Sequence, residues 1–362
     1  MTASPQPAYA RTLRPLLPDE AFAPDRSLLP LSAINAAILM LGWLMADRLD
    51  RWPAAALPLW LPFALLMGNS VFVLGLSMHD LLHGSVVRGA GLRRLVALLG
   101  FSMSWMTPTL WQAVHNREHH QHTNGLNDPD RAYLEAQPRN WGKRLFQLLA
   151  PSQEVSALGL AVGMSSTWAL HHFRTTCSVL LFNSGATDFA PAAFRVSGRE
   201  RRRIALELLA VIGLHAVVVI WLDAEPLKLL LGYFLPLWCA YAMAMGYIYT
   251  NHMLSPLRDD NDPLLTSVSL KLPTFLDCLH GNFSHHSEHH VFPGLSSRYL
   301  PQVRQLLLEH HPDRYRLLGG AQAWRLLLST PRLYRDADTL TDWNGSRSVA
   351  VPMLKGTSAG PG

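Results

Sequence analysis

Three groups of closely spaced histidines are the part of this sequence best suited to chemistry. They are His79-x-x-x-His83, His115-x-x-x-His119-His120 and His286-x-x-His289-His290. Residues three and four apart on an α-helix lie on one face, so each group can direct its imidazoles toward one point, and an adjacent second histidine adds a nitrogen on nearly the same side. Imidazole suits iron, zinc, copper and nickel, whereas magnesium and calcium prefer oxygen. The sequence therefore predicts a transition-metal site.

The number of histidines indicates more than one ion. A structural zinc site is closed by four ligands, which are often thiolates. Eight histidines exceed what one tetrahedral ion can use, so we expect two metal ions. A single His-x-x-x-His could be a pair of surface residues at a membrane interface, but three such groups together argue against that interpretation. The three cysteines, Cys177, Cys239 and Cys278, show no metal-binding or redox spacing.

Four apolar runs would position these histidines. Only 16% of the residues are charged and 49% are hydrophobic. The runs are about 20 residues long, enough to cross roughly 30 Å of hydrocarbon as helices, and cover residues 28–46, 57–78, 204–222 and 229–248. Glu207 and His215 interrupt the third run. Residues 95–111 and 156–170 are apolar but contain proline, hydroxyl or charged residues, and we interpret them as interfacial or re-entrant helices.

The order of these runs sets the expected topology. With four spans, the first histidine group follows the second span, the second group precedes the third span, and the third group follows the fourth span. All three groups would then lie on one side of the membrane. Of the 31 Lys and Arg residues, only Arg48, Arg51 and Lys228 fall in the two short loops on the other side. Because basic loops stay in the cytoplasm, we expect the histidine groups and both termini there.

We therefore predict an all-α integral membrane protein with about four transmembrane helices, interfacial helices and a cytoplasmic cap that carries the histidines. Residues 1–27 are expected to form a cytoplasmic N-terminal segment, 28–310 the membrane domain, and 311–362 a cytoplasmic tail. The tail is expected to be partly disordered, since its end is rich in Gly, Ser and Pro. The basic run at 199–203 is interpreted as a topology anchor facing membrane lipids, and no nucleic-acid partner is expected.

With their neighbouring residues, the histidine groups resemble those of integral-membrane fatty acid desaturases. The motifs are His79-Asp80-x-x-His83-Gly-Ser, His115-x-x-x-His119-His120-x-His122-Thr-Asn and His286-Ser-Glu288-His289-His290-Val-Phe-Pro, followed by Leu300-Pro301. The resemblance implies a di-iron centre held by histidines at the cytoplasmic ends of four transmembrane helices. It also implies that O2 and two electrons are used to introduce a C=C bond into a long acyl chain, carried as an acyl lipid or acyl-CoA.

The same resemblance implies a ligand set. The family often recruits one more histidine from the end of the fourth span, and Asn251-His252 occupies that place here. The metal ligands implied are His79, His83, His115, His119, His120, His252, His286, His289 and His290. His122 and His285 could reach the metals by spacing, but the motif pattern disfavours both. Metal-bound imidazoles usually donate their other N–H to a carboxylate or carbonyl. The neighbouring carboxylates are candidates for this role, namely Asp80, Glu118 and Glu288.

Electrons would have to come from a separate protein, because the sequence contains no haem-binding, flavin, nicotinamide or iron–sulfur motif. A ferredoxin or a cytochrome b5-like carrier is the expected donor. Two alternatives stay open. One is a carotenoid ketolase or hydroxylase, or an alkane hydroxylase, on the same scaffold. A more distant one is a membrane metal transporter, which would place ligands within the spans, where only His215 lies.

Overall fold

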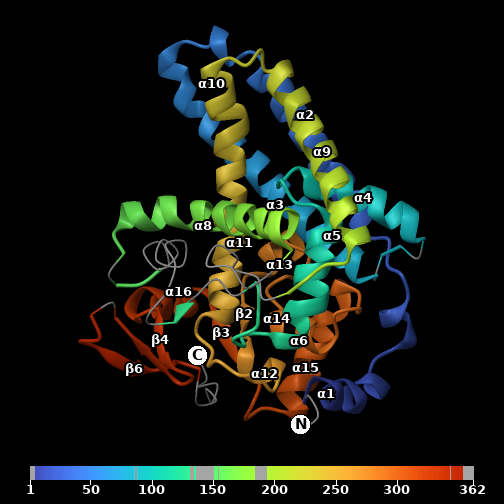
Figure 1. Ribbon diagram of the computed structural model, residues 1–362, viewed down its shortest axis with the longest axis vertical. Coiled ribbons are helices and arrows are strands. Elements are labelled where there is room, and N and C mark those ends of the chain that lie inside the picture. The colour runs from blue at the N-terminus through green and yellow to red at the C-terminus, as the bar shows by residue number, and fades with distance from the viewer. Residues whose placement is uncertain are drawn as a thin grey trace. The chain divides into compact units, whose positions relative to one another are not determined.

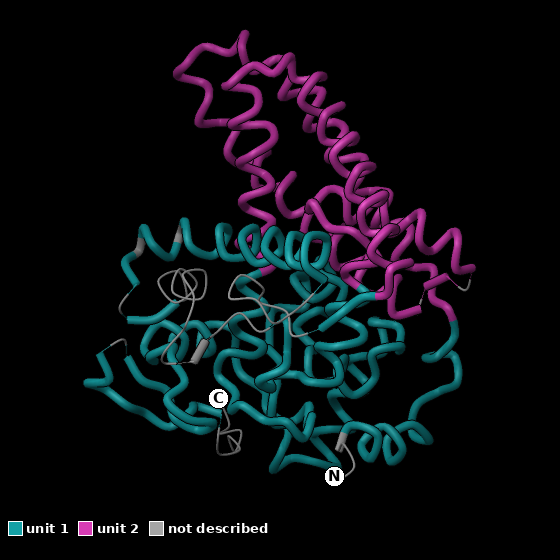
Figure 2. Tube along the Cα trace, viewed as in Figure 1, with its two compact units in different colours: residues 1–23, 112–196, 245–362 teal, residues 24–111, 197–244 magenta. Residues whose placement is uncertain are grey.

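The computed structural model is mostly helical (Figure 1). It describes residues 5–84, 86–87, 89–130, 134–135, 151–153, 155–183, 194–342 and 344–353. The chain divides into two compact units, coloured in Figure 2. Unit 1 comprises residues 1–23, 112–196 and 245–362, and unit 2 comprises residues 24–111 and 197–244. Each unit is built from segments that are far apart in the sequence.

Unit 2 contains most of the long apolar helices. Its helical segments are α2 (Leu28–Ala46), η3 (Leu49–Arg51), η4 (Ala54–Trp60), α3 (Leu61–His83), α4 (Ala90–Ser102), α5 (Pro108–Trp111), α9 (Gly198–Trp221), α10 (Pro226–Leu229), η7 (Leu230–Phe234) and the first part of α11 (Leu235–His252). In the described chain, the segments long and apolar enough to cross a membrane are Leu28–Arg51, Ala54–His83, Gly198–Trp221 and Pro226–His252. The prediction of a helical membrane protein with four spans is confirmed.

The outer faces of these helices are apolar. Leu41 of α2 is 60% exposed and Ile220 of α9 is 73% exposed. Isolated helices with such faces suit a hydrocarbon environment, because their backbone groups are already paired within the helix. Inside unit 2, α2 and α3 approach closely at Gly42, where an added Cβ would lie 2.5 Å from the sulfur of Met67. Small residues at such crossings let apolar helices pack without a polar core.

Helix α3 extends beyond the second predicted span. The apolar run was expected to end at Met78, with the first histidine group following it, but the helix continues to His83. His79 and His83 therefore belong to its last turns. Hydropathy did not reveal this extension, because His79, Asp80 and His83 are polar although their backbone stays helical. Gly84 ends the helix in the left-handed conformation (φ 92°), which glycine adopts without steric cost.

The two segments expected to be interfacial are both helical, and neither is among the candidate spans of the described chain. Residues 95–111 are not one helix, since α4 ends at Ser102 and a turn with Trp105 at φ 60° precedes α5. In unit 1, α8 (Ala157–Cys177) exposes Leu158 and Phe173, while Thr167 and Thr175 are buried. Apolar residues outside and hydroxyls inside fit a helix that lies against lipid.

Unit 1 combines short helices with two small sheets. Its helical segments, besides α8, are α1 (Pro5–Leu13), η1 (Arg14–Leu16), η2 (Asp19–Phe22), η5 (Gln112–His119), α6 (His120–His122), η6 (Ser178–Phe182), the end of α11, α12 (Pro263–Thr266), α13 (Thr274–Leu279), α14 (His286–Val291), η8 (Ser297–Tyr299), α15 (Leu300–His310) and α16 (Gly320–Ser329). The strands are β1 (Leu134–Glu135), β2 (Ser269–Lys271), β3 (Leu317–Gly319), β4 (Leu333–Asp336), β5 (Thr339–Thr341) and β6 (Ser348–Ala350).

These strands were not foreseen from the sequence. β2 pairs with β3 in parallel, with Ser269 opposite Leu317. The larger sheet has the order β1-β4-β5-β6, with β1 and β4 parallel and the other pairs antiparallel. β6 lies in the tail that was expected to be partly disordered, and residues 354–362 of that tail lie outside the described residues. The strands are only two to four residues long, too short for an alternating pattern to be recognised.

A hydrophobic cluster in unit 1 joins the N-terminal segment to the third histidine group. Leu13 and Leu17 pack with Val291, Phe292 and other residues of the segments that follow α14. The side-chain amide of Gln6 also donates to the carbonyl oxygen of His290 at 2.9 Å. Burying such aliphatic side chains stabilises the fold by about 1.5–3 kcal/mol each. The short helix α14, too short to be stable alone, is thus held by residues from both ends of the chain.

Candidate metal centre

Seven of the nine predicted ligands lie in unit 1. The second histidine group begins there on η5, which is π-helical, and continues into α6. In an α-helix, a residue five positions further lies about 140° around the axis. In a π-helix the hydrogen bonds run from i to i+5, so residues five apart come back to the same face. The ring of His115 accordingly lies 4.9 Å from that of His119 and 4.8 Å from that of His120.

The third group lies on α14, where all three histidines are buried. The α-helical spacing expected from the sequence is present, and the rings of His286 and His290, four residues apart, are 4.7 Å from each other. His290 also contacts the second group, since its ring lies 4.6 Å from that of His120. His289 lies 5.1 Å from the His120 ring. The second and third groups therefore meet inside unit 1.

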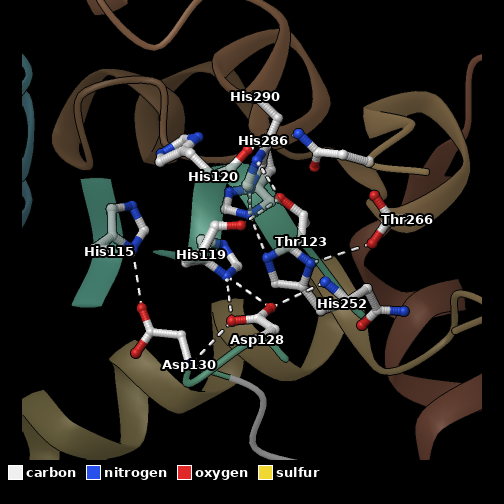
Figure 3. Close-up of polar contacts among 12 residues, drawn as sticks. His115, His119, His120, Thr123, Asp128, Asp130, His252, Thr266, His286 and His290 are labelled. Carbon is white, nitrogen blue, oxygen red and sulfur yellow. Dashed lines mark hydrogen bonds and ion pairs between the residues drawn. The ribbon is translucent and has the colours of Figure 1, made fainter. Parts of the chain in front are cut away.

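His252 completes this arrangement from the last residue of α11. Its Nε2 lies 2.7 Å from Nε2 of His286, which in turn lies 3.1 Å from Nε2 of His290. Figure 3 shows these three side chains and His119 turned toward one another. One nitrogen from each of the four lies within 4.8 Å of the other three, and all four residues are buried. This arrangement is compatible with one metal ion held by imidazole ligands.

Hydrogen bonds at the opposite ring nitrogens orient three of these imidazoles. Nδ1 of His119 lies 2.9 Å from Oδ2 of Asp128, and Nδ1 of His252 lies 3.3 Å from the carbonyl oxygen of Thr266 (Figure 3). An N–H at these positions leaves the lone pair on Nε2. Nδ1 of His290 faces Oγ1 of Thr123 at 3.3 Å, and that hydroxyl donates to the carbonyl oxygen of His119. Such partners fix the tautomer of a ligand and make it more basic.

The charges around these rings differ. Burial lowers the pKa of His119, but the Asp128 carboxylate outweighs burial and raises this pKa above the ordinary value of 6.5. Burial and the neighbouring histidines, foremost His286, hold the pKa of His290 well below that value. His290 is therefore neutral at physiological pH, as a metal ligand has to be. A metal ion at Nε2 would take the place of the second ring proton, while Nδ1 keeps the proton that faces Asp128.

His115 has its own carboxylate partner. Its Nδ1 lies 3.0 Å from Oδ2 of Asp130, and Nε2 of His171 on α8 lies 3.5 Å from the other oxygen. Burial opposes ionisation of Asp130, yet the hydrogen bonds from His115 and His171 hold its pKa well below the ordinary value. The carboxylate is thus charged, and Nε2 of His115 is the nitrogen left for a ligand role.

His79 and His83 belong to unit 2. Their rings are 4.8 Å apart on the last turns of α3, and both contact the indole of Trp111 edge-on. Nδ1 of His79 lies 2.9 Å from Oδ1 of Asp80. Within unit 2, the first histidine group thus has the same pairing of imidazole and carboxylate as the second group.

The other two carboxylates suggested by the sequence pair differently. Glu118 accepts from Arg117 at 2.9 Å. Glu288 is fully buried and accepts from Tyr315 at 2.7 Å and from Arg304 at 2.8 Å, so it holds α14 rather than a ligand ring.

His122 and His285 are absent from the four-histidine group of unit 1. His285 is buried and its Nδ1 lies 3.1 Å from Oγ of Ser284.

Sequence reasoning missed Asp128 and Asp130 as partners of the histidines. The sequence Asp128-Pro129-Asp130 indicates a turn that closes the second group and could bond it to a neighbour, but it does not say which residue that neighbour is. The sequence signal for this pairing was that the two aspartates follow the second histidine group closely along the chain, because a turn directly after a helix can fold its carboxylates back onto that helix. Asn124, at φ 60°, starts this turn, and its side-chain amide donates to the carbonyl oxygen of Pro256 at 2.7 Å. The turn is thereby tied to the segment that follows His252.

These observations define a class of protein: a mostly helical protein with four candidate membrane spans, whose unit 1 holds a buried group of four imidazoles that is compatible with a transition metal. The sequence profile of the family described as Fatty acid desaturase matches residues 56–319, which is more than half of the chain. The chain belongs to the fatty acid desaturase family. A search of curated protein sequences gives no match.

Proposed function

We propose that this protein is an O2-dependent membrane desaturase that introduces a C=C bond into a long acyl chain, presented as an acyl lipid or acyl-CoA. Membership of the family supports the reaction class. The observation that carries the proposal is the group formed by His119, His252, His286 and His290, whose ligand nitrogens lie within 4.8 Å of one another. Four imidazole nitrogen donors in a buried site fit iron as well as they fit zinc, but zinc has no redox chemistry.

We propose two iron ions, with the nine histidines identified from the sequence as ligands. The donor set in unit 1 fits this, because its imidazoles are buried and oriented and no thiolate lies among them. Iron held there would supply, with O2 as co-substrate, the oxidising power that removal of hydrogen from an unactivated acyl chain requires. Thiols are easily oxidised, so a shell without cysteine suits that chemistry.

The side chains around the ligands have two tasks in this proposal. Asp128 and Asp130 accept hydrogen bonds from Nδ1 of His119 and His115, which orients each ring and leaves Nε2 as the nitrogen that would bind the metal. Val291 and Phe292, which are 2% and 6% exposed, cover the end of α14 and limit the access of water. A dry site strengthens electrostatic interactions and prevents side reactions of the oxidant.

The remaining parts of the proposal come from the sequence. Two electrons per turnover would be delivered by a separate ferredoxin or cytochrome b5-like protein. The histidine groups and both termini would lie in the cytoplasm, as the distribution of basic residues indicates. A basic cytoplasmic surface would favour docking of an acidic donor.

The test is gas chromatography–mass spectrometry of fatty acid methyl esters from cells that express the wild type, His286→Ala or His310→Ala. His310 is exposed at the end of α15, and its replacement is the matched control. We expect a new unsaturated species in the wild type and in the control, but not in His286→Ala. Iron content of the purified proteins, measured by mass spectrometry, should fall in His286→Ala alone.

Two results would count against the proposal. Full desaturation by His286→Ala would show that the reaction does not require this site. Unchanged acyl chains in all strains, with a suitable donor co-expressed, would direct attention to carotenoid or alkane substrates.

A further inference from the structure

An aromatic path in unit 1 leads away from the metal centre. The ring of Phe283 lies 5.7 Å from the ring of His286 and 5.3 Å from the ring of Tyr247, both in edge-to-face contact. Tyr247 is on α11, five residues before His252, and is 9% exposed. The path therefore links a predicted ligand to a buried phenol through one intervening ring.

The phenol has a partner suited to take its proton. The hydroxyl of Tyr247 lies 2.8 Å from Nδ1 of His280, the residue that follows α13, and the two rings are in edge-to-face contact at 5.7 Å. Burial lowers the pKa of His280 below its ordinary value, so the imidazole is neutral at pH 7. With its proton on Nε2, Nδ1 accepts the phenolic hydrogen bond. His280 is half-buried and thus closer to solvent than Tyr247.

We propose that Tyr247 and His280 form a proton-coupled redox relay for the metal centre. This proposal rests on the proposed function, because the oxidant is the metal centre after reaction with O2. When no substrate is bound, one electron passes from Tyr247 to that centre, across Phe283, which is not itself oxidised. The phenolic proton moves along the hydrogen bond to His280 Nδ1.

The products are a neutral tyrosyl radical and an imidazolium, while the centre is reduced by one electron. The external electron donor then returns one electron to Tyr247, and the proton returns from His280. No covalent bond other than the O–H bond is broken. The relay thus removes an oxidising equivalent that would otherwise attack His286 or its neighbours.

Tyr247 differs from the neighbouring buried tyrosine on the same helix in the direction that its side chain takes. Tyr249, two residues further on α11, is fully buried. In a helix these two positions point in different directions, about 200° apart. Tyr249 therefore provides a matched control on the same helix, since its phenol does not face His280.

The primary test is electron paramagnetic resonance of iron-loaded, reduced protein that is mixed with O2 without substrate and frozen rapidly. We expect a tyrosyl signal in the wild type and in Tyr249→Phe, and its loss in Tyr247→Phe. In deuterated buffer the signal should show coupling to an exchangeable hydrogen, and His280→Phe should abolish that coupling. Peptide mass spectrometry should find more oxidation of His286 in Tyr247→Phe than in the wild type.

A second measurement does not depend on iron. Flash photo-oxidation of the metal-free protein with a ruthenium polypyridyl compound and an electron acceptor should produce the same Tyr247-dependent signal, because the hydrogen bond to His280 does not involve the metal. A signal that persists unchanged in Tyr247→Phe overturns the relay.

The iron experiment separates the two proposals. No tyrosyl signal from a sample that desaturates its substrate overturns the relay and leaves the proposed function standing. A sample with neither signal nor desaturation overturns both.

Discussion

Replacing Asp128 by Asn should weaken iron binding while leaving the fold intact. The carboxylate is buried, with its side chain 2% exposed, and it has three donors around its two oxygens. These donors are Nδ1 of His119 at 2.9 Å and the backbone N–H groups of Asn124 and Asp130, both at 2.9 Å. An amide keeps only one oxygen, so its NH2 group must face at least one of these donors. A buried donor left without an acceptor costs about 1–3 kcal/mol.

The expected effect on iron follows from this figure. A loss of about 1.4 kcal/mol corresponds to a tenfold change in affinity, and partners of metal ligands typically contribute about 10- to 100-fold. We therefore expect Asp128→Asn to bind iron about 10- to 100-fold more weakly. The assay is competition with a chelator in detergent solution, with iron measured by mass spectrometry. Asp313→Asn, at an exposed position after α15, is the control. Equal iron affinity in Asp128→Asn and the wild type would refute the reasoning.

Three further predictions concern stability, pH and topology. Glu288→Ala should lower the free energy of unfolding by about 3–5 kcal/mol, because it leaves the buried guanidinium of Arg304 without its carboxylate partner. Chemical denaturation measures this loss, and Glu309→Ala, at an exposed position, should have little effect. Equal loss of stability in both variants would contradict the prediction. Iron should be released on acidification as the pH falls through the raised pKa of His119, because the protonated ring cannot bind metal. Dialysis across a pH series, followed by iron analysis, measures the release. Retention of iron down to about pH 5 would argue against the prediction. A membrane-impermeant maleimide should label the exposed Cys278 in inside-out vesicles but not in intact cells. The double variant Ala55→Cys with Cys278→Ser should show the reverse. Labelling of Cys278 in intact cells would contradict a cytoplasmic site.

Much of the fold was accessible to sequence reasoning because lipid imposes a simple rule. A span needs about 20 apolar residues, and the four runs supplied them. The rule fails at span ends, where polar residues continue the helix, as His79 and His83 do on α3. It also says nothing of β2 and β3, because Ser269 and Leu317, which lie opposite each other in this pair, are far apart in the sequence.

The candidate site was predictable to a similar extent. Spacing identified the histidines, because side chains on one helical face converge. Spacing could not identify the π-helical geometry of η5, which depends on backbone hydrogen bonds and not on residue type. Nor could it show that Asp128 rather than Glu118 faces a histidine, because a turn rather than a helix brings that carboxylate back.

The order in which the chain is synthesised gives the four-histidine group a further consequence. His119 is made early, His252 ends the last candidate span, and His286 and His290 come only afterwards. Glu288 anchors the helix that carries His286 and His290, and Tyr315, which donates a hydrogen bond to Glu288, is synthesised later still. A nascent chain can therefore insert all four spans while this group is still incomplete. If the proposed iron centre forms, we therefore expect a shortage of iron during growth to yield inserted, metal-free protein that can be loaded afterwards.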